Sequence, residues 1–288
     1  FFDSLNNNAF AIVNIDDKNG NYMTQNSCAK IYKYALKSRA DFSLKIFEKD
    51  FNGMKMLING SEVWTKLIGE FNAYNILATY SLAKCFELDE EKILNKISAL
   101  NTVDGRFDKI ISRSINKIWI VDYAHSPDSV QKILETLIEL KSNDESLITV
   151  IGCGGDRDKD KRPIMGKIAA SLSDKVIFTS DNPRFEDPKL ILDQIQSGVD
   201  KKDLHKVSNI IDRKKAIKYA CEINYGNDVI LVAGKGHEKF QILGDVKTEF
   251  DDKKILQEFL KKQKWYVIFF IWILRIKISI AWCKFISI

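Results

Sequence analysis

The second half of the chain alternates between short apolar segments and longer segments with helical spacing, and this alternation restricts the possible folds most strongly. The strand-like segments span residues 117–121, 147–151, 175–179 and 228–232. Apolar residues recur with the helical period at residues 128–141, 163–172, 187–197 and 213–223. Strands that alternate with helices form β-α-β units, so this region is predicted to be a mostly parallel sheet covered by helices.

A polar cluster follows each of the four predicted strands. These clusters are Asp122 to His125, Gly152 to Arg157, Asp181 to Arg184, and Gly234 to Glu238. Two of the three histidines, His125 and His237, lie in them. Because ligands of open α/β sheets bind beyond the carboxyl ends of the strands, the clusters predict a binding site at one edge of the sheet.

The charged side chains of these clusters indicate the kind of ligand. Arg157 and Arg184 carry guanidinium groups, which bind carboxylates through two parallel hydrogen bonds. Asp181 and Glu238 supply negative charge from two different loops. We expect this combination to bind a small ligand with several charges, such as a zwitterionic amino acid.

The segment Gly152-Cys153-Gly154-Gly155 lies between a predicted strand and a predicted helix, so its backbone N–H groups are candidates for binding an anion. It does not match the dinucleotide fingerprint G-x-G-x-x-G, which weakens the case for an NAD-dependent enzyme. The alternating charges at residues 158–162 are expected to form a solvated loop.

The first part of the chain has a different pattern and is predicted to be a separate domain, residues 1–104, followed by a second at 105–264. Strands are predicted at residues 10–14, 43–47 and 54–58, and helices at residues 72–86 and 89–100. Asn59-Gly60 is typical of a tight hairpin turn. Polar residues around Gly105 interrupt the pattern and indicate the domain boundary.

Composition excludes several classes of protein. Hydrophobic residues make up 45% and charged residues 29%, which is the balance of a globular protein with its own core. A net charge of +5 is too small to suggest nucleic-acid binding. Five scattered cysteines without a C-x-x-C pair argue against a zinc site or a disulfide framework. With no secretory signal at the start, we expect a cytoplasmic protein.

Residues 265–288 form a strongly apolar tail rich in aromatic residues. Arg275 and Lys277 interrupt the tail near its middle, whereas a membrane helix needs about 20 predominantly apolar residues. We therefore favour a segment foreign to the two domains over a membrane anchor, and expect no membrane partner unless the tail is genuine.

Seven segments resemble the Mur ligase family, in particular its meso-diaminopimelate-adding members. They are NIDD (14–17), GEFNAYN (69–75), GRFD (105–108), VDYAHSPDS (121–129), GCGGDRDKDKRPIMGKIA (152–169), TSDNPRFEDP (179–188) and GKGHEKFQ (234–241). The combination of DNPR with GKGHE is highly specific. The resemblance implies the end of a P-loop-type central domain at 1–104, followed by a Rossmann-like α/β C-terminal domain at 105–264.

The resemblance also implies the reaction. It is that of an ATP-dependent ligase of peptidoglycan precursor synthesis, which adds meso-diaminopimelate to UDP-N-acetylmuramoyl-L-alanyl-D-glutamate through an acyl phosphate, with Mg²⁺. The implied ATP contacts, between the central and C-terminal domains, are Asn72 and Asn75 near the base, Asp122 near the ribose, and Arg106 and His125 near the phosphates. Arg106 and His125 are also implied to be catalytic. The implied diaminopimelate contacts are Arg157, Asp181, Asn182, Pro183, Arg184, Gly234 and Glu238.

Arg184 distinguishes diaminopimelate from lysine, the amino acid that other members of the family add. Diaminopimelate ends in a second carboxylate beside its amine, whereas lysine ends in the amine alone. An arginine buried opposite lysine would meet no anion and would repel the ammonium group. We therefore expect Arg184 to be buried and to bind that carboxylate, and the lysine-adding ligase is the alternative.

The chain departs from the family pattern in its first part. It contains neither a phosphate-binding loop ending in Gly-Lys-Thr or Gly-Lys-Ser nor the segment with the family's carbamylated magnesium-site lysine. The chain is therefore expected to begin within the central domain and to be inactive alone. A non-catalytic amino-acid-binding module is the alternative from a different class.

Overall fold

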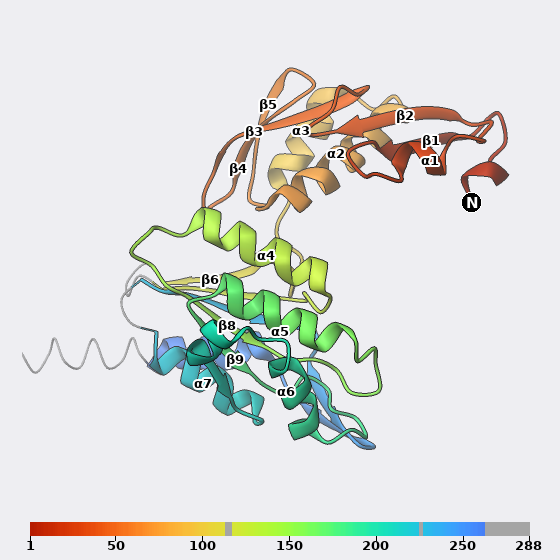
Figure 1. The fold of residues 1–288 in the computed structure, drawn as a ribbon. Coiled ribbons are helices and arrows are strands. Elements are labelled where there is room, and N and C mark those ends of the chain that lie inside the picture. Colours follow the sequence, from red (N-terminus) through yellow and green to blue (C-terminus); the bar gives the residue numbers. More distant parts are fainter. Residues whose placement is uncertain (113–116, 225–226, 263–288) are drawn as a thin grey trace, which may run out of the picture. The chain divides into compact units, whose positions relative to one another are not determined.

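The computed structural model describes residues 1–112, 117–224 and 227–262 (Figure 1). The chain divides into two compact units, Phe1–Thr102 and a second that begins at Val103. The apolar tail predicted at residues 265–288 lies outside the described residues. No helix in the described ranges is long and apolar enough to cross a membrane.

The first unit contains a five-stranded sheet with the strand order β1-β2-β3-β4-β5. The first three strands are parallel, and the last two pairs are antiparallel. The strands are β1 (Phe10–Asn14), β2 (Lys30–Ala35), β3 (Phe42–Lys49), β4 (Met54–Ile58) and β5 (Ser61–Thr65). Asn59 and Gly60 connect β4 to β5 with φ angles of 45° and 94°, as a two-residue hairpin turn with left-handed backbone requires.

Two long helices pack against this sheet, α2 (Glu70–Cys85) and α3 (Glu90–Ala99). The side chain of Asp89 accepts a hydrogen bond from the Lys92 N–H and caps the N-terminus of α3. The short helices η1 (Phe2–Ser4) and α1 (Gly20–Met23) precede β1 and β2. The core is formed by strand residues such as Met54, Met56 and Ile58 together with Leu77 and Tyr80 of α2.

The second unit contains a six-stranded sheet with the order β10-β9-β8-β11-β7-β6. All neighbouring strands are parallel except β6, which runs antiparallel to β7 at one edge. The strands are β6 (Asp108–Ser112), β7 (Lys117–Asp122), β8 (Leu147–Ile151), β9 (Lys175–Phe178), β10 (Val207–Asn209) and β11 (Val229–Ala233). A separate hairpin is formed by β12 (Phe240–Leu243) and β13 (Val246–Glu249).

Every residue of β8 and β11 is buried, because helices cover both faces of this sheet. On one face, α7 (Arg213–Glu222) and the helical residues 252–262 pack against strand residues such as Trp119, Val150 and Val232. The other helices, α4 (Pro127–Leu140), α5 (Lys161–Leu172) and α6 (Pro188–Gln196), pack side by side (Figure 1). The 3-10 helix η2 (Lys201–Lys206) leads into β10.

The strands and helices predicted from the sequence are all present, within a few residues of their predicted ends. Six strands were not predicted: β2, β5, β6, β10 and the two hairpin strands β12 and β13. Their apolar pattern is weak, since β10 has three residues and every residue of β13 is exposed. The antiparallel β6 makes the sheet mixed at this edge, as the prediction of a mostly parallel sheet allows.

Candidate functional site

The strand order brings the four predicted polar clusters together. Strands β9, β8, β11 and β7 are neighbours in the sheet, and all four run in the same direction. The clusters follow the carboxyl ends of these strands, so they lie in a row along one edge. The sequence predicted that the four clusters share one edge of the sheet, and the structure confirms this arrangement.

The glycine-rich loop after β8 packs directly against the turn at Asp181 to Arg184. The Gly155 N–H donates to the Asn182 carbonyl at 2.9 Å, and the Asp156 N–H donates to the Glu186 carboxylate at 2.6 Å. A side chain at Gly155 would overlap the Pro183 carbonyl. Close packing of two backbones therefore explains this glycine, and one of the N–H groups considered for anion binding, that of Gly155, is occupied by a protein acceptor.

Arg162 contradicts the prediction that residues 158–162 form a solvated loop. Residues 158–160 are exposed, but the Arg162 side chain is fully buried. Its guanidinium donates to both oxygens of Glu186 at 2.9 Å and to the Gly154 carbonyl at 3.0 Å. The acceptors come from another loop, so the local charge pattern did not reveal them. Arg162 and Glu186 join the glycine-rich loop to the turn that carries Arg184.

This ion pair predicts a specific dependence of stability on pH. The hydrogen bonds from Arg162 lower the pKa of Glu186 from 4.5 to about 2. A carboxyl group with a lowered folded-state pKa stabilises the fold above its unfolded pKa and loses that effect as the pH falls towards the folded value. The stability difference between the unsubstituted chain and Arg162→Met, measured by urea unfolding, should be largest above pH 4.5 and shrink towards pH 2. A difference independent of pH would contradict this assignment.

Arg184 is held in a strained backbone conformation by contacts on both sides. Its φ angle is +53°, in the left-handed region that costs a non-glycine residue about 1–3 kcal/mol. The Arg184 N–H donates to Ile242 in the β12–β13 hairpin at 3.1 Å, and the Arg184 carbonyl accepts from Gly244 at 2.7 Å. Arg184 Nη1 donates to the Gly155 carbonyl at 2.7 Å. The residue is half-buried and not fully buried as predicted, because one side of the turn faces solvent.

Arg157 and Arg184 approach each other above Gly154. A Cβ atom built on Gly154 would lie 3.0 Å from Arg184 Nη1 and 3.6 Å from Arg157 Cγ. Arg157 is exposed, and its guanidinium donates to the Asp156 carbonyl at 3.2 Å. The two arginines predicted to bind carboxylates therefore both lie close to Gly154.

The Asp181 carboxylate is buried without a hydrogen-bond donor among the residues that the structure describes. Its nearest cation is Lys235, whose Nζ lies 3.8 Å from Asp181 Oδ1. Burial raises the pKa of Asp181 above its ordinary value, although the charges of Arg213 and Lys235 act in the opposite direction. A buried carboxylate that lacks a donor favours a ligand group that can donate hydrogen bonds, such as an ammonium.

Asn182 and Glu238 belong to a hydrogen-bonded network around Lys235, a residue that the sequence analysis did not select. Asn182 Nδ2 donates to the Glu238 carboxylate at 2.9 Å, and Asn182 Oδ1 accepts from Lys235 and from the Ile242 N–H. Burial favours a higher pKa for Glu238, but the hydrogen bonds from Asn182 and Lys235 outweigh it and lower the pKa. Lys235 lies between two glycines in GKGHE, and that position was the available signal.

Gly234 faces Asp181 at the end of β11, and its φ angle is +111°. A Cβ atom on Gly234 would lie 2.7 Å from Asp181 Oδ2. We expect Gly234→Ala to destabilise the second unit by about 1–3 kcal/mol through backbone strain and also to displace the Asp181 carboxylate. Gly244→Ala is the matched control, because its φ angle of +56° imposes strain but no atom lies within 4 Å of the added Cβ. Both variants should lose stability in urea unfolding. In a binding assay, only Gly234→Ala should lose affinity for the amino acid expected from the sequence.

An arginine and two histidines surround Tyr123, after β7. The Arg106 guanidinium lies over the Tyr123 ring at 4.7 Å, and the rings of His125 and His237 lie 4.6 and 5.2 Å from it. His125 Nδ1 is 2.8 Å from the Tyr123 carbonyl and donates to it, because a carbonyl oxygen can only accept a hydrogen bond. Arg106, His125 and His237 are all exposed. The arrangement offers several cationic or donating groups to an anion such as a phosphate.

Asp122, the residue implied to contact the ribose, has an additional structural role. Its two carboxylate oxygens accept hydrogen bonds from the Phe107 and Ala124 N–H groups, each at 2.7 Å. Burial raises the pKa of Asp122 although these hydrogen bonds act against it. Each oxygen retains a second lone pair, so the carboxylate remains able to accept a bond from a hydroxyl group.

Asn72 and Asn75, the residues implied to lie near the base, belong to α2 of the first unit. Asn72 Nδ2 donates to the Ile68 carbonyl at 2.7 Å, and Asn75 is exposed. The structure brings Arg157, Asp181, Asn182, Pro183, Arg184, Gly234 and Glu238 together in the second unit. The roles of all these residues in ligand binding stay predictions.

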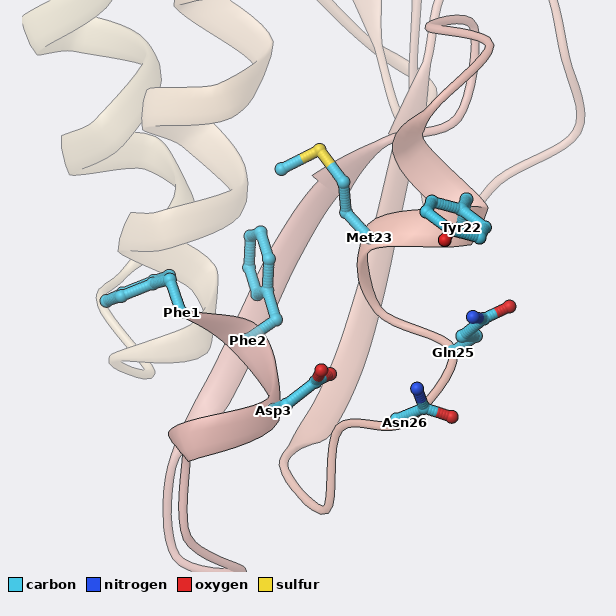
Figure 2. Close-up of a pocket in the computed structure, with 7 residues that line it drawn as sticks. All are labelled: Phe1, Phe2, Asp3, Tyr22, Met23, Gln25 and Asn26. Carbon is cyan, nitrogen blue, oxygen red and sulfur yellow. The ribbon is translucent and has the colours of Figure 1, made fainter.

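Two hollows are formed largely by other residues. One, of about 260 Å³, is formed in the first unit by Phe1, Phe2, Asp3, Tyr22, Met23, Gln25 and Asn26 (Figure 2). Asp3 is the one charged side chain among them, and Figure 2 shows the amides of Gln25 and Asn26 at the end opposite Phe1. The other, of about 400 Å³, shares Pro183 with the turn but is not lined by Asp181, Arg184 or Glu238. We assign no ligand to either hollow.

In the described ranges, no group of three or more His, Cys, Asp or Glu side chains is arranged to hold a metal ion. We therefore assign no residue of this chain to Mg²⁺.

Comparison with protein families identifies the chain. The model of the Mur ligase middle domain matches residues 1–83, and that of the Mur ligase glutamate ligase domain matches residues 105–236. An α/β unit with a charged site at the carboxyl ends of its strands agrees with the second match. The chain therefore belongs to the Mur ligase family, whose members form amide bonds with the help of ATP.

Curated relatives specify the kind of Mur ligase to which the chain is similar. The UDP-N-acetylmuramoyl-L-alanyl-D-glutamate–2,6-diaminopimelate ligase of Cytophaga hutchinsonii is 47% identical over 260 residues, 90% of this chain and 53% of the relative. The enzyme of the same name from Phocaeicola vulgatus is 48% identical over 258 residues, 90% of this chain and 53% of the relative. The chain thus spans about half the length of the curated relatives it matches.

Solved structures agree with the fold. A structure of UDP-N-acetylmuramoyl-L-alanyl-D-glutamate–2,6-diaminopimelate ligase is 32% identical, with a TM-score of 0.61 over 89% of this chain and 54% of that one. The MurF ligase of Thermotoga maritima in complex with ADP shares the fold at 17% identity, with a TM-score of 0.61 over 80% of this chain and 51% of that one.

Proposed function

We propose that this chain is part of an ATP-dependent ligase that adds meso-diaminopimelate to UDP-N-acetylmuramoyl-L-alanyl-D-glutamate. One observation carries the proposal: a buried carboxylate without a donor, Asp181, lies three residues before Arg184, whose strained backbone is held by the β12–β13 hairpin. Strain retained at a solvent-accessible cluster of charges is typical of a functional site. The names of the similar curated relatives support the same activity.

The proposed amino-acid site uses charges of both signs. Arg184 keeps guanidinium donors for a carboxylate, because Nη1 alone has a hydrogen-bond partner among the described residues. Asp181 offers an acceptor for the ammonium group beside that carboxylate, and Arg157 adds a second cation over Gly154. The far end of diaminopimelate carries both charges. Lysine would leave Arg184 without an anion, so we favour the lysine-adding ligase less as an interpretation.

We also propose that residues 105–264 form the amino-acid-binding domain and residues 1–104 the C-terminal part of the central domain. Arg106 and His125 would orient and neutralise phosphate groups, Asp122 would contact the ribose, and Asn72 and Asn75 the base. ATP, when bound, supplies the phosphoryl group that converts the glutamyl carboxylate of the dipeptide into an acyl phosphate. The amino group of diaminopimelate, oriented by its far end in the site, then forms the amide.

The cysteines support the proposed cytoplasmic location. Cys28, Cys85, Cys153 and Cys221 are all free thiols, and free thiols persist in a reducing compartment.

The test joins residues 1–264 to the upstream half of the Cytophaga hutchinsonii relative and measures phosphate release. We expect release that requires ATP, the nucleotide-linked dipeptide and diaminopimelate together, and no release from the 288-residue chain alone. A non-catalytic amino-acid-binding module is the second candidate. The Asp181 carboxylate, which lacks a hydrogen-bond donor within the described ranges, favours it, but the exposed cluster of Arg106, His125 and His237 around Tyr123 does not. Diaminopimelate binding by a joined enzyme that never releases phosphate would support that module.

A further inference from the structure

Lys235 lies fully buried at the centre of the proposed amino-acid site. Its Nζ donates to Asn182 Oδ1 at 2.9 Å and to Glu238 Oε2 at 3.0 Å, and lies 3.8 Å from Asp181 Oδ1. Through these contacts, Lys235 connects the loop after β11 with the turn after β9. Its ammonium group is surrounded by protein and is therefore not a ligand-binding group itself.

The charges around Lys235 leave one negative charge in excess. Asp181 and Glu238 contribute two carboxylates, and Lys235 contributes one ammonium. The next charged groups, Arg213 and Asp252, form a closed pair with hydrogen bonds of 2.9 and 2.7 Å, so their charges cancel. His237 also approaches Glu238, but its ring is exposed to solvent. One further ammonium group would make the cluster neutral.

We propose that Lys235 is a positioning residue that fixes Asn182 and Glu238 and sets the net charge of the cluster of Asp181, Lys235 and Glu238 to match one ammonium group of the incoming amino acid. This inference rests on the proposed function, because it assumes that an amino acid binds beside Asp181. The inference requires both carboxylates to be ionised before the ammonium group enters: burial raises the pKa of Asp181, and the charges of Arg213 and Lys235 act against that rise. Binding near neutral pH then requires no exchange of protons with solvent.

Replacing Lys235 with methionine changes this charge balance while keeping most of the side-chain volume. Two carboxylates then share a buried site without their cation, so one of them takes up a proton. An entering ammonium group must displace that proton. Lys235→Met should thus release close to one proton when diaminopimelate binds, and affinity should fall about tenfold for each pKa unit by which the carboxyl pKa exceeds the assay pH.

Titration calorimetry of the full chain with meso-diaminopimelate, in two buffers of different ionisation enthalpy, measures this proton release. We expect close to none for the unsubstituted chain and close to one for Lys235→Met. Lys239→Met is the matched control, since Lys239 is an exposed lysine of the same loop, paired with Asp251 at 2.9 Å; it should behave like the unsubstituted chain. Equal proton release by Lys235→Met and the unsubstituted chain would overturn the inference.

A ligand-free measurement separates this inference from the proposed function. In carboxyl ¹³C NMR titrations of the free chain, the pKa of Glu238 should lie below its ordinary value, and in Lys235→Met the pKa of Glu238 or Asp181 should rise. Unchanged carboxyl titrations in a folded Lys235→Met variant would refute the role of Lys235 in setting the charge. If those titrations shift but the unsubstituted chain binds no diaminopimelate, the proposed function fails and the charge compensation stands.

Discussion

Replacing Arg184 with alanine should lower kcat/KM for diaminopimelate by about thirtyfold or more in the joined enzyme. The expected loss is about 2–5 kcal/mol, the usual effect of removing one partner of a hydrogen-bonded charge pair. Because Arg184 is half-buried, we expect the lower part of this range. The loss should occur mainly in KM, since Arg184 is proposed to bind the end of the amino acid that does not react.

Two further variants make the Arg184 prediction specific. Arg184→Lys keeps the charge but cannot form two parallel hydrogen bonds, so its loss should be intermediate. Lys189→Ala removes an exposed cation five residues along the chain and should leave the kinetics unchanged. Undiminished diaminopimelate addition by Arg184→Ala would contradict the assignment of this residue.

Breaking the buried ion pair between Arg213 and Asp252 should give the largest loss of stability in the second unit. Both side chains are fully buried and share two hydrogen bonds, and Arg213 also donates to the Ala233 carbonyl at 2.9 Å. Asp252→Ala leaves an arginine charge buried without its partner, which costs about 3–5 kcal/mol. Urea unfolding of the second unit should show this decrease.

The controls for this pair follow from the same physics. Replacing both residues, as in Arg213→Met with Asp252→Leu, should recover a large part of the loss because no buried charge remains. Lys254→Met disrupts an exposed pair with Glu249, whose side chains are 62% and 79% accessible, and should leave stability nearly unchanged. A cost for Asp252→Ala as small as that for Lys254→Met would show that this pair does not support the fold.

The order of strands and helices was predictable because each buried segment carries its own apolar pattern. Strands β8 and β11 are continuous apolar runs, as expected of parallel strands covered on both faces. The hairpin β12–β13 was not predictable in the same way, because it has little buried surface. Its role is to hold Arg184, through hydrogen bonds that join residues about 60 positions apart.

The buried cations could not be assigned from the sequence. Arg162 lies in a run of charges that predicts a solvated loop. Its partner Glu186 comes from a different loop, 24 residues away. Lys235 is likewise buried through contacts with Asn182, 53 residues away. A charge can be buried only where its partners are positioned by the tertiary fold, so the local pattern does not reveal it. The residues proposed to bind the ligand were easier to select as candidates, since they follow the strand ends.

The most direct test of the central claim offers the joined enzyme equal concentrations of meso-diaminopimelate and L-lysine, with ATP and UDP-N-acetylmuramoyl-L-alanyl-D-glutamate. Mass spectrometry of the nucleotide-linked product then shows which amino acid was added. Because Arg184 and Asp181 together match a carboxylate beside an ammonium, we predict that almost all of the product contains diaminopimelate. A product made mainly with lysine would contradict the account, as would diaminopimelate and lysine products in equal amounts.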